Sequence, residues 1–189
     1  MKLVLASASP RRRMLLSAIG IEPHAIRPAN IDERPLPGEG ALAHVKRLAS
    51  QKALAVHRGA GEVVLAADTI VHLGDTIYGK PANPVEAART LATLSGRAHS
   101  VTTAWCMLGA RCESGHTTSV VHFRTLTDAE VAAYIGTGEG TDKAGGYGIQ
   151  GLGAALIAHV SGDHSNVVGL PLTPVLAALR AAGIQPEHA

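Results

Sequence analysis

The chain has 189 residues, of which 46% are hydrophobic and 17% are charged. This composition is typical of a globular protein with one well-formed core and excludes a disordered chain. The net charge of +2 and the small number of aromatic residues (one Phe, one Trp and three Tyr) argue against binding a nucleic acid strand or a membrane surface.

The two cysteines, Cys106 and Cys112, form neither a C-x-x-C motif nor a metal-binding pattern with histidine. They favour reduced thiols in a cytoplasmic protein. The apolar run at the N-terminus is too short for a signal peptide, and no stretch approaches the roughly 20 apolar residues that a membrane-spanning helix needs. We therefore expect a cytoplasmic protein without a membrane segment.

In the first half of the chain, apolar runs typical of strands alternate with patterns typical of helices. The expected elements are a strand over 2–6, a helix that begins at Ser9-Pro10 with Ser9 as its cap and ends near Gly20, a strand and then a loop over 22–40, a helix over 41–57 and a strand over 62–67 that ends at Asp68-Thr69. Residues 70–73 either continue this strand or begin a hairpin.

The second half continues the alternation and contains no repeat or linker. The expected elements are a helix from Asn83-Pro84 to Leu94, a hairpin of strands over 100–108 and 117–126, a helix from the capping box at Thr127 to Ile135, a glycine-rich loop over 136–153, a strand over 154–160 and a helix from Thr173 to Ala182. This order predicts an α/β or α+β domain.

The segment Ser7-Ala8-Ser9-Pro10-Arg11-Arg12-Arg13 joins the first strand to the first helix. A helix N-terminus favours an anion and disfavours Arg, so consecutive arginines there need a reason. A bound polyphosphate supplies one, because Arg holds phosphate oxygens with paired hydrogen bonds. The alternative is a solvated basic turn that pairs with acids elsewhere.

Asp68 follows the apolar run 62–67, which predicts a carboxylate at the C-terminal end of a strand. Ligands bind at that edge of open α/β sheets, and a carboxylate there can hold Mg²⁺ or take a proton from water. The alternative is an Asp that caps the next turn. Lys80, between Gly79 and Pro81, and Lys52 on the second helix are weaker candidates for binding phosphate.

The glycine-rich loop contains G-x-G-x-x-G at Gly146, Gly148 and Gly151. We reject a dinucleotide fold, because this motif should follow a strand and open a helix. The loop instead predicts a close approach of backbone to ligand, with the Gln150 amide suited to the edge of a nucleobase. The adjacent Asp163, His164 and Ser165 do not predict a catalytic triad, because neighbours in sequence seldom meet in its geometry. We expect a packed loop there that leads into the last helix.

Several of these stretches, taken in order, resemble the Maf family of nucleoside triphosphate pyrophosphatases. The resemblance runs from Leu3 to Leu172 and rests on Leu5-Ala6-Ser7-Ala8-Ser9-Pro10-Arg11-Arg12, Arg47-Leu48-Ala49 with Lys52-Ala53, Ala67-Asp68-Thr69, Gly79-Lys80-Pro81, Leu94-Ser95-Gly96-Arg97, Asp142 through Gln150-Gly151, and Val168-Gly169-Leu170-Pro171-Leu172. Each motif is weak alone, and their order makes the signal specific.

The resemblance implies a single domain over 1–189 with an α/β fold like that of inosine triphosphatases, in which a long mixed sheet and two lobes surround a central cleft. It implies hydrolysis of a nucleoside triphosphate to the monophosphate and pyrophosphate with a divalent cation, Mg²⁺ or Mn²⁺, by a homodimer. The implied roles are proton acceptor for Asp68, metal binding for Asp68 and Glu33, and phosphate binding for Ser7, Arg11, Arg12, Lys52 and Lys80.

Three positions resemble the branch of the family that acts on dTTP and UTP: Arg11, Thr69 and Gln150. The branch that acts on 7-methyl-GTP has Trp, Gln and Glu there. The alternatives are a house-cleaning pyrophosphatase for non-canonical purine nucleotides, a non-enzymatic regulator of septum formation and, against the charge and aromatic content, a DNA-binding protein.

Overall fold

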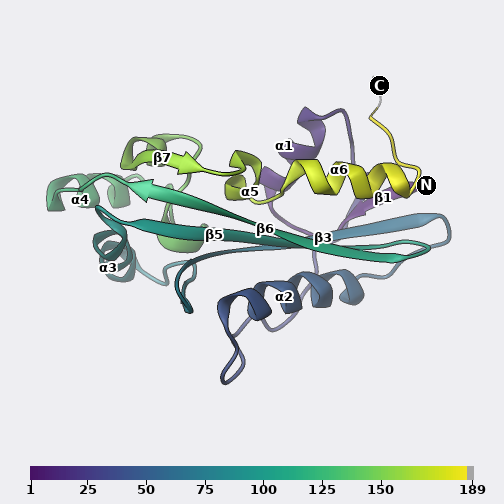
Figure 1. Ribbon diagram of the computed structural model, residues 1–189, viewed down its shortest axis with the longest axis horizontal. Helices are drawn as coiled ribbons and strands as arrows, with labels where there is room; N and C mark the ends of the chain where they lie inside the picture. The colour runs from purple at the N-terminus through teal and green to yellow at the C-terminus, as the bar shows by residue number, and fades with distance from the viewer. Residues whose placement is uncertain (187–189) are drawn as a thin grey trace.

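A twisted seven-stranded sheet runs along the length of the molecule (Figure 1). The computed structural model describes residues 1–186. The strand order is β2-β1-β3-β5-β6-β7, with β4 paired to part of β3. The strands are β1 (Lys2–Leu5), β2 (Ala25–Ile26), β3 (Glu62–Leu73), β4 (Thr76–Tyr78), β5 (Ala98–Leu108), β6 (Cys112–Phe123) and β7 (Ile157–Ser161).

Strand β1 is parallel to β2 and β3, and the other pairs are antiparallel. The expected long mixed sheet is therefore confirmed. The predicted strand over 117–126 is displaced, because β6 begins at Cys112 and ends at Phe123. Alternate residues in the first half of β6 are exposed, so the outward face of this half is polar. The first half of the strand therefore contains no apolar run that would indicate a strand.

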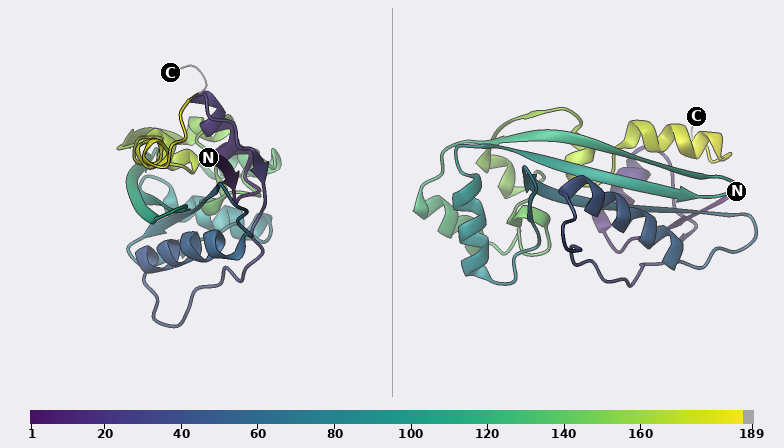
Figure 2. Two further views of the ribbon diagram at one scale, coloured as in Figure 1. Left: turned by 90° about the vertical axis from the view of Figure 1, so that its right-hand side faces the viewer. Right: turned by 60° about the horizontal axis from the view of Figure 1, so that its bottom comes forward.

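Helices cover the two faces of the right half of the sheet, with α2 on one side and α1, α5 and α6 on the other (Figures 1 and 2). Helices α3 and α4 pack at the opposite end of the long strands (Figure 1). The helices are α1 (Pro10–Ala18), α2 (Ala41–Ala55), α3 (Pro84–Leu94), α4 (Asp128–Gly136), α5 (His164–Val168) and α6 (Leu172–Ala181).

Two of the three predicted caps are confirmed, and the third is wrong, because the Ser9 side chain makes no capping hydrogen bond to α1. The Asn83 side chain accepts from the Glu86 backbone N–H at 2.9 Å at the start of α3. Thr127 and Glu130 form a reciprocal capping box at the start of α4. Each cap pairs backbone groups that the first helical turn leaves unsatisfied, which explains why these two boundaries follow from the sequence.

Two expectations for the C-terminal third are wrong. The predicted strand over 154–160 begins as a 3-10 helix (Leu152–Leu156), and only Ile157–Ser161 pairs with β6. A short apolar run fits a strand or a helical turn equally well, so its hydrophobic pattern does not decide between them. The segment predicted as a loop before the last helix contains α5, which Asp163 caps through the Ser165 backbone N–H at 2.7 Å.

Asp68 lies inside a strand rather than at its end, so the expectation of a carboxylate at the strand terminus is wrong, and the alternative in which residues 70–73 continue the strand is confirmed. Strand β3 continues through residue 68 to Leu73, because β5 pairs with it along this whole stretch and places Ala104 opposite Asp68. Its parallel neighbour β1 ends at Leu5, opposite Leu65. The edge of β3 beyond Leu65 is therefore free of β1, and the chain turns away there into α1.

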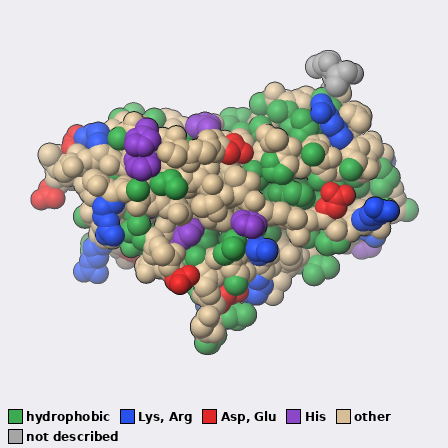
Figure 3. Space-filling model, in the orientation of Figure 1, with side chains coloured by type: hydrophobic (Ala, Val, Ile, Leu, Met, Phe, Trp, Pro, Cys, Tyr) green, Lys and Arg blue, Asp and Glu red, His purple; other side chains and the backbone are tan. Residues whose placement is uncertain are grey.

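No helix among residues 1–186 is long and apolar enough to cross a membrane. On the face of the molecule in Figure 3, Lys and Arg side chains are spread among other residues and form no single broad basic surface. This distribution agrees with the small net charge of +2.

Candidate active site

A cleft of about 820 Å³ opens where β1 ends and β3 continues. Its walls come from the β1–α1 connection, α2, the middle of β3, the turn after β4 and the glycine-rich loop. All nine residues that the sequence nominated line it: Ser7, Arg11, Arg12, Glu33, Lys52, Asp68, Thr69, Lys80 and Gln150. The fold thus brings together residues that lie up to 143 positions apart, from 7 to 150, in the sequence.

Arg12 is buried in the first turn of α1 and is held by three acceptors. Its Nε donates to the Gly169 carbonyl at 2.8 Å, its NH1 to the Ser7 hydroxyl at 3.0 Å and its NH2 to the Thr69 hydroxyl at 3.1 Å. Burial lowers the pKa of Arg12 from its ordinary value, and the nearby Asp68 carboxylate opposes that shift. A guanidinium stays charged in proteins, so Arg12 is a fixed cation in the cleft wall.

The β1–α1 connection leaves backbone groups free to face the cleft. The Ser9 side chain makes no capping hydrogen bond to α1, and no acidic residue lies in the first turn of the helix. The first N–H groups of a helix have no partners within the helix, and the dipole there favours negative charge. Together with Arg12, this end of the cleft suits an anion.

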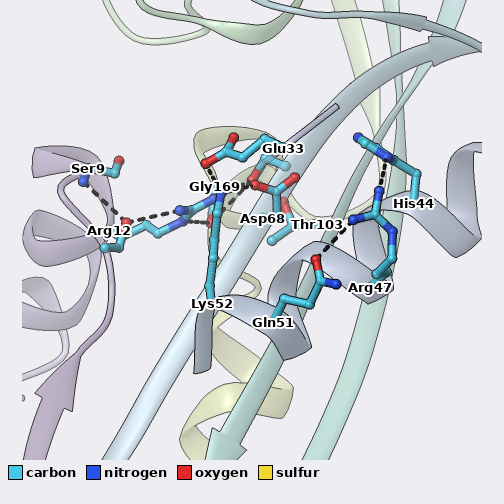
Figure 4. Close-up of polar contacts among 12 residues, drawn as sticks. Ser9, Arg12, Glu33, His44, Arg47, Gln51, Lys52, Asp68, Thr103 and Gly169 are labelled. Carbon is cyan, nitrogen blue, oxygen red and sulfur yellow. Dashed lines mark hydrogen bonds and ion pairs between the residues drawn. The ribbon is translucent and has the colours of Figure 1, made fainter. Parts of the chain in front are cut away.

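Lys52 joins two carboxylates from different parts of the chain (Figure 4). Its Nζ lies 2.5 Å from Asp68 Oδ1 and 2.8 Å from Glu33 Oε1. The side chains of Lys52 and Asp68 are buried, whereas that of Glu33 is 51% exposed. Two carboxylate oxygens therefore lie against one ammonium group in the cleft. The buried ion pair between Lys52 and Asp68 fixes the position of Asp68.

A second group of charges joins the first turn of α1 to the glycine-rich loop. Arg11 NH1 lies 3.0 Å from Asp142 Oδ2, and Lys143 Nζ lies 2.6 Å from Asp142 Oδ1. Burial acts to raise the pKa of Asp142, but the hydrogen bonds from Lys143 and Arg11 outweigh it and hold this pKa below its ordinary value. The side chains of Lys80 and Gln150 are exposed and border the cleft.

The Thr69 side chain is bonded to Arg12 in the cleft wall. Its hydroxyl accepts from Arg12 NH2 and lies 2.9 Å from the Thr103 hydroxyl. The Thr103 hydroxyl in turn donates to the Asn166 carbonyl at 2.9 Å. This chain of hydroxyl groups links the cleft wall to α5, so Thr69 is part of the framework that orients Arg12.

The glycine-rich loop is folded on itself by close backbone contacts. A Cβ added at Gly140 would lie 2.0 Å from the Gly146 carbonyl oxygen, and one at Gly153 would lie 2.2 Å from the Gly148 carbonyl oxygen. Only glycine fits at such distances. The rejection of a dinucleotide fold is confirmed, because Gly151 leads into a 3-10 helix and then β7 rather than into an α-helix.

The contacts of three residues, two in the glycine-rich loop and one in the segment between β2 and α2, were not predicted from the sequence. Glu139 accepts from the backbone N–H groups of Leu152 at 2.8 Å and Gly153 at 2.9 Å, which anchors the loop. Tyr147, in the loop, bonds to the buried His99 at 2.7 Å. Glu39 binds Arg47 on α2. An acid between two glycines, Gly138 and Gly140, is the sole sequence signal for Glu139, and no signal pairs Tyr147 with His99.

Asp163, His164 and Ser165 form no triad, as expected. Asp163 Oδ1 accepts from both the backbone N–H and the hydroxyl of Ser165 at 2.7 Å. This carboxylate therefore caps a helix instead of orienting a histidine.

The described residues include no group of three or more His, Cys, Asp or Glu side chains arranged to hold a metal ion. Asp68 and Glu33 are nevertheless a chemical fit for a hard divalent cation, because their oxygens converge on the Lys52 ammonium. Mg²⁺ is commonly held by one or two carboxylates together with substrate phosphates and water. Two carboxylates in a cleft lined by several Lys and Arg side chains match that pattern.

Comparisons with known proteins identify the family of this chain. A family model described as "Maf-like protein" matches residues 2–182. The dTTP/UTP pyrophosphatase of Cereibacter sphaeroides is 49% identical over 185 residues, which cover 97% of this chain and 96% of that protein. The dTTP/UTP pyrophosphatase of Sphingopyxis alaskensis is 50% identical over 186 residues, with 96% and 97% covered.

Among solved structures, the Staphylococcus aureus Ham1 protein matches 65% of this chain and 72% of its own at 14% identity, with a TM-score of 0.45. At that level the similarity bears on no functional assignment. The family match and the two relatives each span nearly the whole chain. The protein therefore belongs to the Maf family.

Proposed function

We propose that this protein hydrolyses dTTP and UTP to the nucleoside monophosphate and pyrophosphate. The observation that carries the proposal is the buried set of Arg12, Lys52 and Asp68, which places two fixed cations and a carboxylate on one wall of the cleft. Relatives with about half of their residues identical are named dTTP/UTP pyrophosphatase, which supports the same reaction.

The triphosphate would lie along the cationic wall. Such a ligand carries close to four negative charges, which the cleft offsets with the side chains of Arg11, Arg12, Lys52 and Lys80. The Arg12 guanidinium is held in place by three hydrogen bonds and can donate a pair of hydrogen bonds to phosphate. The Ser7 hydroxyl beside it adds a neutral donor. Arg11 must exchange Asp142 for phosphate when the substrate enters.

Asp68 would orient a water molecule and take its proton during in-line attack at the α-phosphorus. Lys52 contacts only its Oδ1 among residues 1–186, which leaves Oδ2 available to the water. The burial of Asp68 keeps bulk water away from this carboxylate and strengthens its electrostatic interactions. The cations beside it stabilise the charge that develops on the pyrophosphate leaving group.

A divalent cation, Mg²⁺ or Mn²⁺, would be held by Asp68 and Glu33. When bound, such an ion supplies positive charge against the phosphate oxygens. Lys52 competes for the same two carboxylates, so its contacts with Asp68 and Glu33 set how readily they accept a second cation.

The base would lie against the glycine-rich loop, where Gln150 borders the cleft. Its amide both donates and accepts, which matches the edge of a pyrimidine. Thr69 contributes to selectivity from the neighbouring wall, where its hydroxyl fixes Arg12. With only five aromatic residues in the chain (one Phe, one Trp and three Tyr), we expect hydrogen bonds to decide base choice more than stacking.

The chain would act as a single domain of two lobes over 1–189, in a cytoplasmic homodimer that takes a free nucleotide rather than a nucleic acid strand. The family resemblance supports the dimer, and the two free cysteines agree with a reducing compartment. The mass of the purified chain, measured by sedimentation at micromolar concentration, tests the proposed dimer. A monomer alone would contradict it.

The test of the proposed reaction is turnover of a nucleotide panel with Mg²⁺ or Mn²⁺, followed by release of pyrophosphate. We expect dTTP and UTP to have the highest kcat/KM. Preference for inosine or xanthosine triphosphate would favour the purine alternative. Absence of turnover for the whole panel, from a folded protein, would favour the non-enzymatic role in septum formation.

A further inference from the structure

The segment that carries Glu33 has no regular structure of its own. We call residues 27–40, between β2 and α2, the strap; it contains no helix and no strand, and residues 32–38 are exposed. Glu33 nevertheless reaches Lys52 at 2.8 Å. A long irregular segment keeps one position only where side chains or backbone groups tie it down.

Arg47 on α2 ties the strap at two points. Its Nε and NH2 donate to the two carboxylate oxygens of Glu39 at 2.6 and 2.7 Å, and NH2 also donates to the Arg34 carbonyl at 3.1 Å. Its NH1 donates to Gln51 on the same helix at 2.9 Å (Figure 4). One guanidinium therefore holds the end of the strap and the residue next to Glu33 against α2.

Glu39 is the matching anchor on the strap. Its side chain is only 8% exposed, although the strap around it faces solvent. It also accepts from the Leu36 backbone N–H at 3.1 Å and lies 3.0 Å from His44 Nδ1. The hydrogen bonds from Arg47 hold the pKa of Glu39 far below its ordinary value, so the carboxylate stays ionised at neutral pH.

We propose that Arg47, paired with Glu39, is a positioning residue that holds Glu33 on Lys52 at the mouth of the cleft. Arg47 borders neither the proposed phosphate path nor the base, since it does not line the cleft. It would act through Glu33, and this inference rests on the proposed function because that function gives Glu33 its role. A lysine keeps the charge of Arg47 but cannot make the paired bonds to Glu39 and reach Arg34 as well.

The first experiment follows the strap and needs no activity. Hydrogen exchange of peptides that cover residues 28–40 is compared for the wild-type chain, Arg47→Lys and Lys46→Gln. Lys46 is an exposed neighbour on α2 and serves as the matched control. We expect the strap amides to exchange about tenfold faster in Arg47→Lys, since charge-assisted hydrogen bonds are among the stronger ones. Unchanged exchange would overturn the proposal.

The second experiment asks whether Arg47 acts through Glu33. The effect of Arg47→Lys on kcat/KM for dTTP is measured in the wild-type chain and in Glu33→Gln. We expect about a tenfold loss in the first background and less than about a twofold loss in the second, because the two changes remove the same function. Equal losses in both backgrounds would overturn the proposal, as would full activity of Glu33→Gln.

The two experiments separate this inference from the proposed function. A wild-type chain that turns over no nucleotide refutes the proposed reaction, whereas the exchange measurement still decides whether Arg47 fixes the strap. If Arg47→Lys does not fold, Glu39→Gln removes the same ion pair from the strap side and takes its place in both experiments.

Discussion

The two ends of the cleft are built differently. The end proposed to bind phosphate, here called the phosphate end, is formed by residues that are at most 9% exposed: Ser7, Arg12, Lys52 and Asp68. Arg12 is bonded to Ser7, and Lys52 is paired with Asp68. The loop end, formed by Asp142 and Gln150, is made of exposed side chains. A buried, interlocked set is oriented before the ligand arrives, whereas exposed side chains can adjust to it.

This difference in burial suggests that the two ends of the cleft have different roles. The phosphate end has the features that chemistry needs, because fixed charges there need not reorganise during the reaction. The loop end has the features that selection among similar ligands needs, because single exposed side chains can be exchanged without disturbing the core. Substitutions at the phosphate end should therefore lower kcat, and those at the loop end should alter base preference.

The largest effect is expected for Asp68→Asn. The amide cannot take a proton from water, so we expect kcat for dTTP to fall by on the order of 10³ or more while the fold is kept. Circular dichroism and steady-state kinetics measure the two properties, with Asp128→Asn, an exposed position on α4, as control. Near wild-type turnover would refute the proposed role of Asp68.

A smaller effect is expected for Arg12→Lys. Lysine keeps the charge but cannot bond to Gly169, Ser7 and Thr69 at once, so we expect kcat to fall by on the order of 10². The buried acceptors left unpaired should also lower the free energy of unfolding by about 1–3 kcal/mol. The matched control is Arg13→Lys, an exposed neighbour on α1, and equal behaviour of the two variants would contradict a special role for Arg12.

At the loop end, Gln150→Glu should change selectivity more than rate. The carboxylate can no longer donate a hydrogen bond to the base, so we expect the ratio of kcat/KM for dTTP to that for purine triphosphates to shift by about tenfold. Gln185→Glu, at an exposed position near the end of the described residues, is the control for the added charge. An unchanged ratio would count against base reading by Gln150.

We expect acid to lower the stability of the fold through His99, which contacts the glycine-rich loop. Burial lowers the pKa of His99 from 6.5 to about 4, and His99 bonds to Tyr147 in the loop. Between these two pH values, His99 is protonated in the unfolded chain but not in the folded chain. The free energy of unfolding therefore falls as the pH drops from about 6.5 towards 4. Between pH 7 and pH 5 this histidine should cost about 2 kcal/mol of unfolding free energy.

Chemical denaturation of the wild-type chain and His99→Phe at both pH values measures this effect. The variant lacks the titrating group, so its free energy of unfolding should depend less on pH over this range. The same pH dependence in both chains would show that His99 does not stay neutral in the fold.

The sequence predicted the composition of the phosphate end but not its geometry. Ser7, Arg12, Lys52 and Asp68 were each nominated, and each lines the cleft. What remained hidden are partners set by tertiary packing, such as the Gly169 carbonyl that lies 157 positions from Arg12. No local pattern encodes such a contact.

The fold shows the same limit. Capped helices were predicted closely, because a cap is a local interaction between neighbouring residues. The position of Asp68 within β3 followed from only one of two alternatives for residues 70–73, because the length of that strand depends on pairing with the distant β5. The apolar run at 154–160 was assigned to a single strand, because its pattern lacks the information that separates a 3-10 helix from a strand.

The proposed reaction can be tested at the level of the broken bond. Hydrolysis of dTTP in ¹⁸O-labelled water, with mass spectrometry of both products, shows which phosphorus the water attacks. Attack at the α-phosphorus, with Asp68 orienting the water, predicts ¹⁸O in the monophosphate and none in the pyrophosphate. Label in the pyrophosphate, or release of inorganic phosphate in its place, would contradict the account.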